Sequence, residues 1–208
     1  MIFEQKYQIL VEDFDKNANM TLGAILRIFE NVGNGHSELA KDGIFATREQ
    51  AWVLSEWNIE IIKLPKYSDN IIAQTWSHDL SSPLWATRDY VLKINDEICV
   101  KGVSKWIWFD LNQNKICKIN TDILDRYKPE PTKLFGDQKF EKIAVDDEIL
   151  GETRIFVRKS DFDFNGHVHN LEYLNYALEV LCIRWFVTSF EGRSLLTYCT
   201  CPLSPLIL

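Results

Sequence analysis

A short motif occurs twice in this chain, and this repeat constrains the fold more than any other feature of the sequence. Asp13-Phe14-Asp15-x-Asn17 and Asp161-Phe162-Asp163-x-Asn165 match at an offset of 148 residues. Each copy follows a short stretch of strand character and precedes a run with helical periodicity. A match this short can arise by chance, but the shared context favours two copies of one strand–loop–helix unit.

The two copies differ at a position that bears on chemistry. Asn19 in the first copy corresponds to His167 in the second. An imidazole changes its charge near neutral pH, whereas an amide does not titrate. We therefore expect any acid–base chemistry to reside in the second copy.

The residues after the first motif predict one long helix followed by an antiparallel sheet. From about Thr21, apolar residues recur at helical spacing: Leu22, Ile25, Leu26 and Phe29. The Gly33-Asn34-Gly35 segment is expected to interrupt this helix, and the nearby His36 is expected to be structural. Segments of strand composition cover residues 6–11, 52–62, 71–76, 85–94, 98–109 and 115–119. A helix covered by such a sheet is an α+β arrangement.

Composition limits the classes of function. The chain has 208 residues, 46% of them hydrophobic, which is enough for a sizeable core. A net charge of −7 argues against nucleic acid as a partner. No apolar run reaches the roughly 18 residues of a membrane span, and the N-terminus lacks the apolar core of a signal peptide. Five cysteines, an odd number, fit a reduced cytoplasmic setting.

The second copy is shorter than the first. Residues 128–149 contain Pro129, Pro131 and Gly136 and are predicted to be a linker between residues 1–127 and 150–208. Residues 152–158 are expected to form a strand before the second motif. The helix after it should carry one apolar side, formed by Leu171, Leu174, Leu178, Leu181 and Trp185. The uncharged tail, residues 195–208, has room for at most one or two short strands, so this helix would lack its cover.

Three interpretations of residues 161–170 compete. The first is helix capping, which accounts for one or two of the polar residues but not for all of them. The second is a calcium loop, because Asp161-x-Asp163-x-Asn165-Gly166-x5-Glu172 satisfies the EF-hand pattern. An EF-hand needs a helix before its loop, however, and residues 153–157 favour a strand. Zinc at His167-x-His169 would lack a third ligand at a recognisable spacing.

The third interpretation is acid–base catalysis. His167 can act as a general base near neutral pH, and Asp163 or Asp161 can orient it. Asn165 can donate to a carbonyl oxygen or hold a water molecule. The N–H groups near Val168 to Asn170, at the start of the helix, can stabilise an oxyanion. These are the groups needed to hydrolyse an activated acyl group such as a thioester.

The same stretch resembles a motif of the acyl-[acyl-carrier-protein] thioesterases, a family of tandem hot-dog proteins. The family pattern Ser-Asp-x-Asp-x-Asn-x-His-x-Asn-Asn-x-x-Tyr is matched by Ser160-Asp161-x-Asp163-x-Asn165-x-His167-x-His169-Asn170-x-x-Tyr173. Glu179 matches an acid late in the family's helix. Further similarities occur in the expected order in the first half: Trp52-Val53, Pro65-x-Tyr67-x-Asp69, Thr75-Trp76, Arg88-Asp89-Tyr90 and Ser104-x-Trp106.

The resemblance implies a tandem hot-dog fold with a complete first copy and an incomplete second copy. It implies hydrolysis of fatty acyl-carrier-protein thioesters in fatty acid biosynthesis, with Asp163, Asn165 and His167 as catalytic residues. No cofactor and no metal is implied. The expected partner is acyl carrier protein, for which Lys63, Lys66, Arg154, Arg158 and Lys159 could form a basic patch, and a homodimer is left open. The first hot dog is expected to help shape the acyl tunnel.

The chain departs from the family pattern in two places. His169 replaces the first Asn of the Asn-Asn pair. The family also places a catalytic Glu, often beside a Cys, on a later strand, and no Glu-Cys matches it here; Cys199 and Cys201 lie in the uncharged tail. We therefore expect the chain to be truncated. A catalytically impaired acyl-binding remnant is the alternative to an active enzyme, and an EF-hand-like calcium module at residues 161–172 is the third class.

Overall fold

The computed structural model describes residues 1–41, 49–136, 140, 152–163, 166–180, 188–190 and 193–199. Its helices and turns are η1 Val11–Asp13, α1 Leu22–Ala40, α3 Thr121–Arg126, η2 Lys159–Asp161 and α4 Asn170–Val180. Its strands are β1 Phe3–Tyr7, β2 Gln50–Ile61, β3 Ile71–Ser77, β4 Trp85–Ile94, β5 Glu97–Asp110, β6 Lys115–Ile116, β7 Thr188–Phe190 and β8 Arg193–Cys199. The strands form one sheet in the order β1-β3-β4-β5-β2-β8-β7, with β6 paired to β5.

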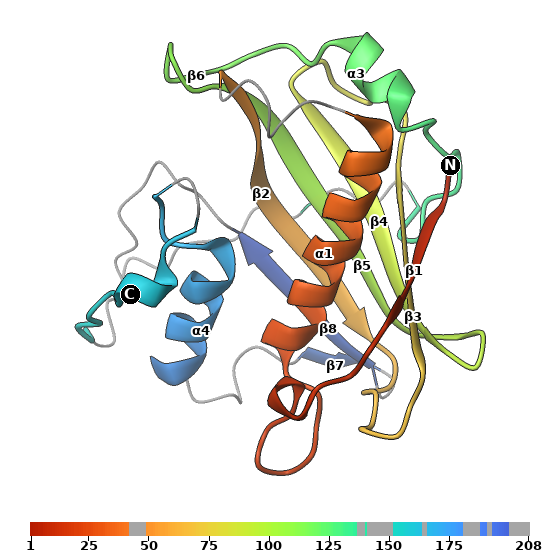
Figure 1. The fold of residues 1–208 in the computed structure, drawn as a ribbon, viewed down its shortest axis with the longest axis vertical. Coiled ribbons are helices and arrows are strands. Elements are labelled where there is room, and N and C mark those ends of the chain that lie inside the picture. Colours follow the sequence, from red (N-terminus) through yellow and green to blue (C-terminus); the bar gives the residue numbers. More distant parts are fainter. Residues whose placement is uncertain are drawn as a thin grey trace.

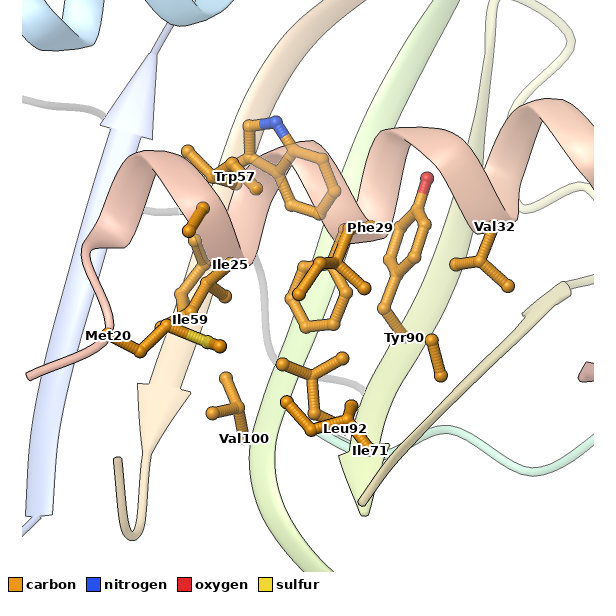
Figure 2. Close-up of a cluster of buried hydrophobic side chains, with 14 of the residues drawn as sticks. Met20, Ile25, Phe29, Val32, Trp57, Ile59, Ile71, Tyr90, Leu92 and Val100 are labelled. Atoms are coloured by element: carbon orange, nitrogen blue, oxygen red, sulfur yellow. The ribbon is translucent and has the colours of Figure 1, made fainter. Parts of the chain in front are cut away.

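The long helix α1 crosses one face of this sheet (Figure 1). The main cluster of buried side chains combines residues of α1 with residues of the strands. Phe29 of α1 sits over Trp57 of β2 and Tyr90 of β4, with ring centroids 5.8 and 5.0 Å away (Figure 2). Gly102 of β5 leaves room for the Phe29 ring, because a Cβ atom there would come within 2.7 Å of it. Burying these large side chains supplies most of the free energy that holds the helix on the sheet.

The predicted break in the helix at Gly33-Asn34-Gly35 is wrong, because α1 continues to Ala40. Both glycines are sites of close approach rather than breaks. A Cβ atom at Gly33 would lie 3.4 Å from the Tyr90 hydroxyl, and one at Gly35 would lie 2.9 Å from the Phe3 ring. Packing against the sheet therefore outweighs the roughly 1 kcal/mol that each glycine costs within a helix.

Most of the predicted strands occur, with changes at their ends. The hairpin through Asn95-Asp96 is confirmed, and both turn residues have positive φ, as a tight hairpin turn requires. The first strand is shorter and earlier than expected, since β1 ends at Tyr7. The strand expected at residues 152–158 is not present in this described stretch, which is extended chain without ladder partners. The short helix α3, capped by the Asn120 side chain, was not predicted.

The second copy uses the core of the first. Strand β8 pairs antiparallel with β2, and α4 lies beside α1 on the same side of the sheet (Figure 1). Leu171 and Leu174 of α4 join the buried cluster formed by α1 and the sheet, and Leu178 packs against it. The expectation that this helix lacks cover is therefore wrong for these three leucines. Leu181 and Trp185 lie outside the described residues. The domain boundaries at 127 and 150 stay predictions.

The start of the predicted linker is fixed along β3 and β4. The indole N–H of Trp76 donates to the Thr132 carbonyl at 2.8 Å, and the Leu134 N–H donates to the Asp89 carboxylate at 2.7 Å. Asp89 is almost fully buried and lies 3.1 Å from the His78 ring. These contacts attach the segment that leaves the first copy to the sheet.

Candidate active site

The two motif loops have the same backbone hydrogen bonds. The Asp15 N–H donates to the Asn19 carbonyl at 2.9 Å in the first copy, and the Asp163 N–H donates to the His167 carbonyl at 2.8 Å in the second. Likewise, the Thr21 N–H donates to the Asp13 carbonyl at 2.9 Å in the first copy, and the His169 N–H donates to the Asp161 carbonyl at 2.8 Å in the second. Ala18 and Gly166 occupy the same place in the turn, and both have positive φ, 60° and 78°. The repeat read from the sequence is therefore a repeat in structure.

The first Asp of each motif is buried and anchors its loop. Asp13 accepts the Leu10 N–H at 2.7 Å and pairs with Arg27 of α1. Asp161 accepts the Arg158 N–H at 2.8 Å, and it also accepts bonds from the Arg158 side chain and the Tyr176 hydroxyl. The Tyr176 hydroxyl, followed by the Arg158 groups, holds the pKa of Asp161 below its usual value. The proposed role of Asp161 in orienting His167 is therefore wrong, because its carboxylate faces Arg158 and Tyr176.

The second Asp of the motif, Asp163, contacts the backbone of the predicted base, His167. The Asp163 carboxylate accepts the His167 N–H at 3.1 Å, just as Asp15 accepts the Asn19 N–H at 2.9 Å. His167 itself is exposed. Asn165 lies outside the described residues. Asp163 therefore fixes the backbone that carries His167, and the roles of the three predicted catalytic residues stay predictions.

The predicted oxyanion donors are partly occupied. The His169 N–H donates a hydrogen bond to the Asp161 carbonyl, and the Leu171 N–H donates one to the His169 ring at 3.3 Å. His169 thus caps α4 in the way that Thr21 caps α1, where the Thr21 hydroxyl accepts the Ala24 N–H at 3.1 Å. The His169 N–H is consequently unavailable to a substrate in this arrangement.

The calcium interpretation is not favoured by the loop. The described residues 152–158 before it are extended and lead into the short turn η2, whereas an EF-hand has a helix there. Asp161, which would be the first ligand, is directed toward Arg158 and Tyr176. Among the described residues, no three His, Cys, Asp or Glu side chains converge in a way that could bind a metal ion.

A cavity of about 500 Å³ opens beside this loop, between α1 and the sheet. Its lining includes Glu30, Asn34 and Ser37 from α1, Arg88 and Tyr90 from β4, and His169 from the second loop. Trp52 and Trp106 add apolar surface. The cavity is thus lined mainly by the first copy, and His169 is the residue that the described part of the second copy adds to it.

A cluster of aromatic and basic groups, which includes Arg88 and Tyr127 of the cavity lining, packs against α1. The Arg88 guanidinium donates to the His36 ring at 2.9 Å and lies 4.9 Å from the centre of the Tyr127 ring. His36 is fully buried and stacks on Phe3. Burial, and then the charge of Arg88, lower the pKa of His36 to about 3, so the ring is neutral. This agrees with the structural role predicted for His36.

Near the loop, the cavity is lined by a partly buried acid, Glu30, that the sequence did not single out. The Glu30 carboxyl oxygen lies 3.5 Å from the His169 ring nitrogen Nε2. The Glu30 side chain is 15% exposed, and burial raises its pKa to about 8. Glu30 follows Phe29 in the helix and looks like an ordinary surface acid when the sequence is read alone. Among the described residues, its partner comes from the second loop, which packs against α1.

Comparison with protein families connects the two halves of the chain to one group. Residues 1–127 match the family model described as acyl-ACP thioesterase N-terminal domain, and residues 145–195 match the corresponding C-terminal domain. The chain belongs to the acyl-ACP thioesterase family. The resemblance read from the motif is confirmed, and so is the α+β hot-dog fold that it implied.

The relatives are distant, and the chain spans about half the length of the curated relatives it matches. It is 24% identical over 196 residues to an oleoyl-acyl carrier protein thioesterase of Coriandrum sativum, covering 85% of this chain and 53% of that protein. A palmitoyl-acyl carrier protein thioesterase of Cuphea hookeriana is 21% identical over 196 residues, with 86% and 46% covered.

Solved structures of such enzymes share the fold. An acyl-ACP thioesterase from Bacteroides thetaiotaomicron superimposes with a TM-score of 0.75 at 22% identity, covering 88% of this chain and 74% of that one. The 12:0-ACP thioesterase from Umbellularia californica gives a TM-score of 0.71 at 16% identity, with 86% and 74% covered. Among the helices that the structure describes, none has the length and apolarity needed to cross a membrane.

Proposed function

We propose that this chain hydrolyses fatty acyl thioesters of acyl carrier protein, with His167 as the general base and Asp163 and Asn165 as its catalytic partners. One observation carries the proposal. The two loops have matching backbone hydrogen bonds, but the second loop, whose His169 lines the cavity, carries the imidazole of His167 where the first carries the amide of Asn19. The family of the chain supports the thioester substrate.

The chemistry follows from the groups available. His167 takes a proton from water, whose oxygen attacks the thioester carbonyl carbon; the carbon–sulfur bond then breaks, leaving a fatty acid and a thiol. Asp163 holds the backbone of His167 in place through the bond to its N–H. Asn165 would hold the water molecule or the carbonyl oxygen. The acyl chain would occupy the cavity between α1 and the sheet.

Acyl carrier protein would approach over the second loop, in a cytoplasmic setting. Of the basic residues predicted to form its contact, Lys63, Lys66, Arg154 and Lys159 are exposed. Arg158 is partly engaged, because its side chain pairs with Asp161 and lies 3.5 Å from Glu172. Exposed lysines and arginines suit an acidic carrier protein, since attraction between opposite charges speeds encounter.

The test compares the two loops. Purified chain is given acyl carrier protein loaded with a fatty acid, and release of the free acid is measured for wild type, His167→Ala and Asn19→Ala. Loss of a general base lowers kcat by about 1000-fold, while Asn19→Ala should keep wild-type activity. Thermal unfolding of each variant checks that the fold is kept. Wild-type chain that binds the acyl thioester without releasing acid, or His167→Ala with full activity, would overturn the proposal; the first result would identify an acyl-binding remnant.

A further inference from the structure

The Glu30–His169 pair joins the two copies at the edge of the cavity. Glu30 belongs to α1 of the first copy, and His169 is the last residue before α4 of the second. Across the described part of the chain, the Glu30 carboxyl group has no hydrogen bond and no ion pair other than its 3.5 Å contact with His169. A carboxyl group that only stabilised the fold would be expected to have a cation or several N–H donors around it.

The surroundings of Glu30 favour its neutral, protonated form. Desolvation in the cavity raises its pKa to about 8, so most of the carboxyl groups carry a proton at neutral pH. The His169 ring from the second loop lies 3.5 Å from the Glu30 carboxyl group, and the titratable or charged residues of β4 that line the same cavity are Tyr90 and Arg88. A protonated carboxyl group in a substrate cavity can donate a hydrogen bond or a proton, as an ionised one cannot.

We propose that Glu30 is a further catalytic residue, which gives its proton to the departing sulfur of the thioester. The inference rests on the function proposed above. His167 takes one proton from water as the carbon–oxygen bond forms. When the carbon–sulfur bond breaks, the electron pair goes to sulfur, and the Glu30 proton neutralises it, so a thiol leaves. His167 then loses its proton to solvent, and Glu30 regains one, so no further reactant is needed.

The position of His169 suits the return of that proton. Its side chain is 42% exposed, whereas Glu30 is only 15% exposed, so the imidazole connects the partly buried carboxyl group to solvent. Imidazoles relay protons well near neutral pH. His169 is therefore assigned as a positioning and relay residue, and this assignment gives a reason for a histidine where the resembled family motif has an asparagine.

An acid of this kind suits the leaving group. Proton transfer is most effective when donor and acceptor have similar pKa values near the working pH. An alkyl thiol of the cysteine type titrates near about 8.5. Thiols attached to an electron-poor aromatic ring are far more acidic, and their thiolates leave without help. The contribution of Glu30 should consequently depend on the leaving thiol.

The experiment measures hydrolysis of two thioesters with the same acyl chain, one on acyl carrier protein and one on 4-nitrothiophenol. Glu30→Gln keeps the size of the side chain but has no proton of this acidity to give. We expect kcat to fall by about 100-fold on the carrier-protein thioester and by less than about threefold on the aryl thioester. His167→Ala should impair both substrates. Glu38→Gln, an exposed acid on the same helix, is the matched control and should change neither.

A pH profile gives a second measurement that a purely structural role would not change. Since Glu30 must be protonated to act, kcat on the carrier-protein thioester should fall as pH rises through about 8, and this fall should be absent in Glu30→Gln. His169→Asn should cause a smaller loss, about tenfold, that added imidazole restores. Thermal unfolding is measured for each variant.

The outcomes separate the two proposals. Equal losses on both thioesters in Glu30→Gln would mean that Glu30 only shapes the cavity, and unchanged kcat would mean that it takes no part; either result overturns the inference while leaving His167 as the base. A wild-type chain that hydrolyses neither thioester would overturn the proposed function, and the role of Glu30 with it.

Discussion

The two motif loops are built alike and are used differently. Both are fixed by a buried Asp and by the same backbone bonds, and each leads directly into a helix. The first loop carries Asn19 and Thr21 at the positions where the second carries His167 and His169. The comparison shows that the loop scaffold depends on a few Asp contacts, so the other positions can change without loss of the backbone. Variants at the Asp anchors and at the turn positions test that separation.

The largest effect on stability should come from the anchor of the first loop. Asp13→Ala leaves the Leu10 N–H and the Arg27 guanidinium without their acceptor, so we expect the free energy of unfolding to fall by about 2 kcal/mol. Asp161→Ala should cost less, because its partner Arg158 is 68% exposed, while Arg27 is 39% exposed. Urea unfolding of both variants measures the difference. A larger loss in Asp161→Ala would show that the second loop is the more strongly anchored of the two.

A smaller and opposite pair of effects should come from the turn position. Gly166 has φ of 78° with open space around it, so Gly166→Ala adds only backbone strain and should lower stability by about 1 kcal/mol. Ala18 already carries that strain at φ of 60°. Ala18→Gly should therefore stabilise the protein, by less than the loss in the other loop, since glycine also gives the unfolded chain more freedom. Unfolding curves for the two variants decide; changes of the same sign would break the equivalence of the loops.

The sequence predicted the loops and the layers better than the element ends. The repeat carried the information, because Asp, Asn and Gly at fixed places in a turn satisfy local backbone groups that need no distant partner. The helix α1 was predicted to break at Gly33 because local propensity disfavours glycine, yet Tyr90 and Phe3, distant in sequence, need that space. The α3 helix was missed although Asn120 and Asp122 form a recognisable cap.

The candidate site was predicted only in part for the same reason. Its local half, Asp163 next to His167, follows from the motif. Its distant half, Glu30 with His169 at the cavity, depends on how α1 packs against the second loop. Asp161 shows how a sequence motif can suggest a role that packing does not support. The motif allows its carboxylate to serve in a triad, but the partner that lowers its pKa most is the Tyr176 hydroxyl from α4.

The smallest effect should be a difference in acid stability between the loops. The pKa values of Asp15 and Asp161 both lie below the usual 3.8, for Asp15 chiefly through the Asn19 N–H and for Asp161 chiefly through the Tyr176 hydroxyl. A carboxylate with a lowered pKa stabilises the folded state above its unfolded pKa, and this contribution disappears as pH falls through the folded pKa. Stability should therefore decline as pH drops below about 4, and less steeply in Asp15→Asn or Tyr176→Phe. Melting temperatures between about pH 5 and 2 measure these slopes. Because the Tyr176 hydroxyl donates to Asp161 in the second loop, Tyr176→Phe should reduce only the contribution of that loop to the slope. An unchanged slope in that variant would mean that Arg158 and Ser160 suffice to keep Asp161 ionised.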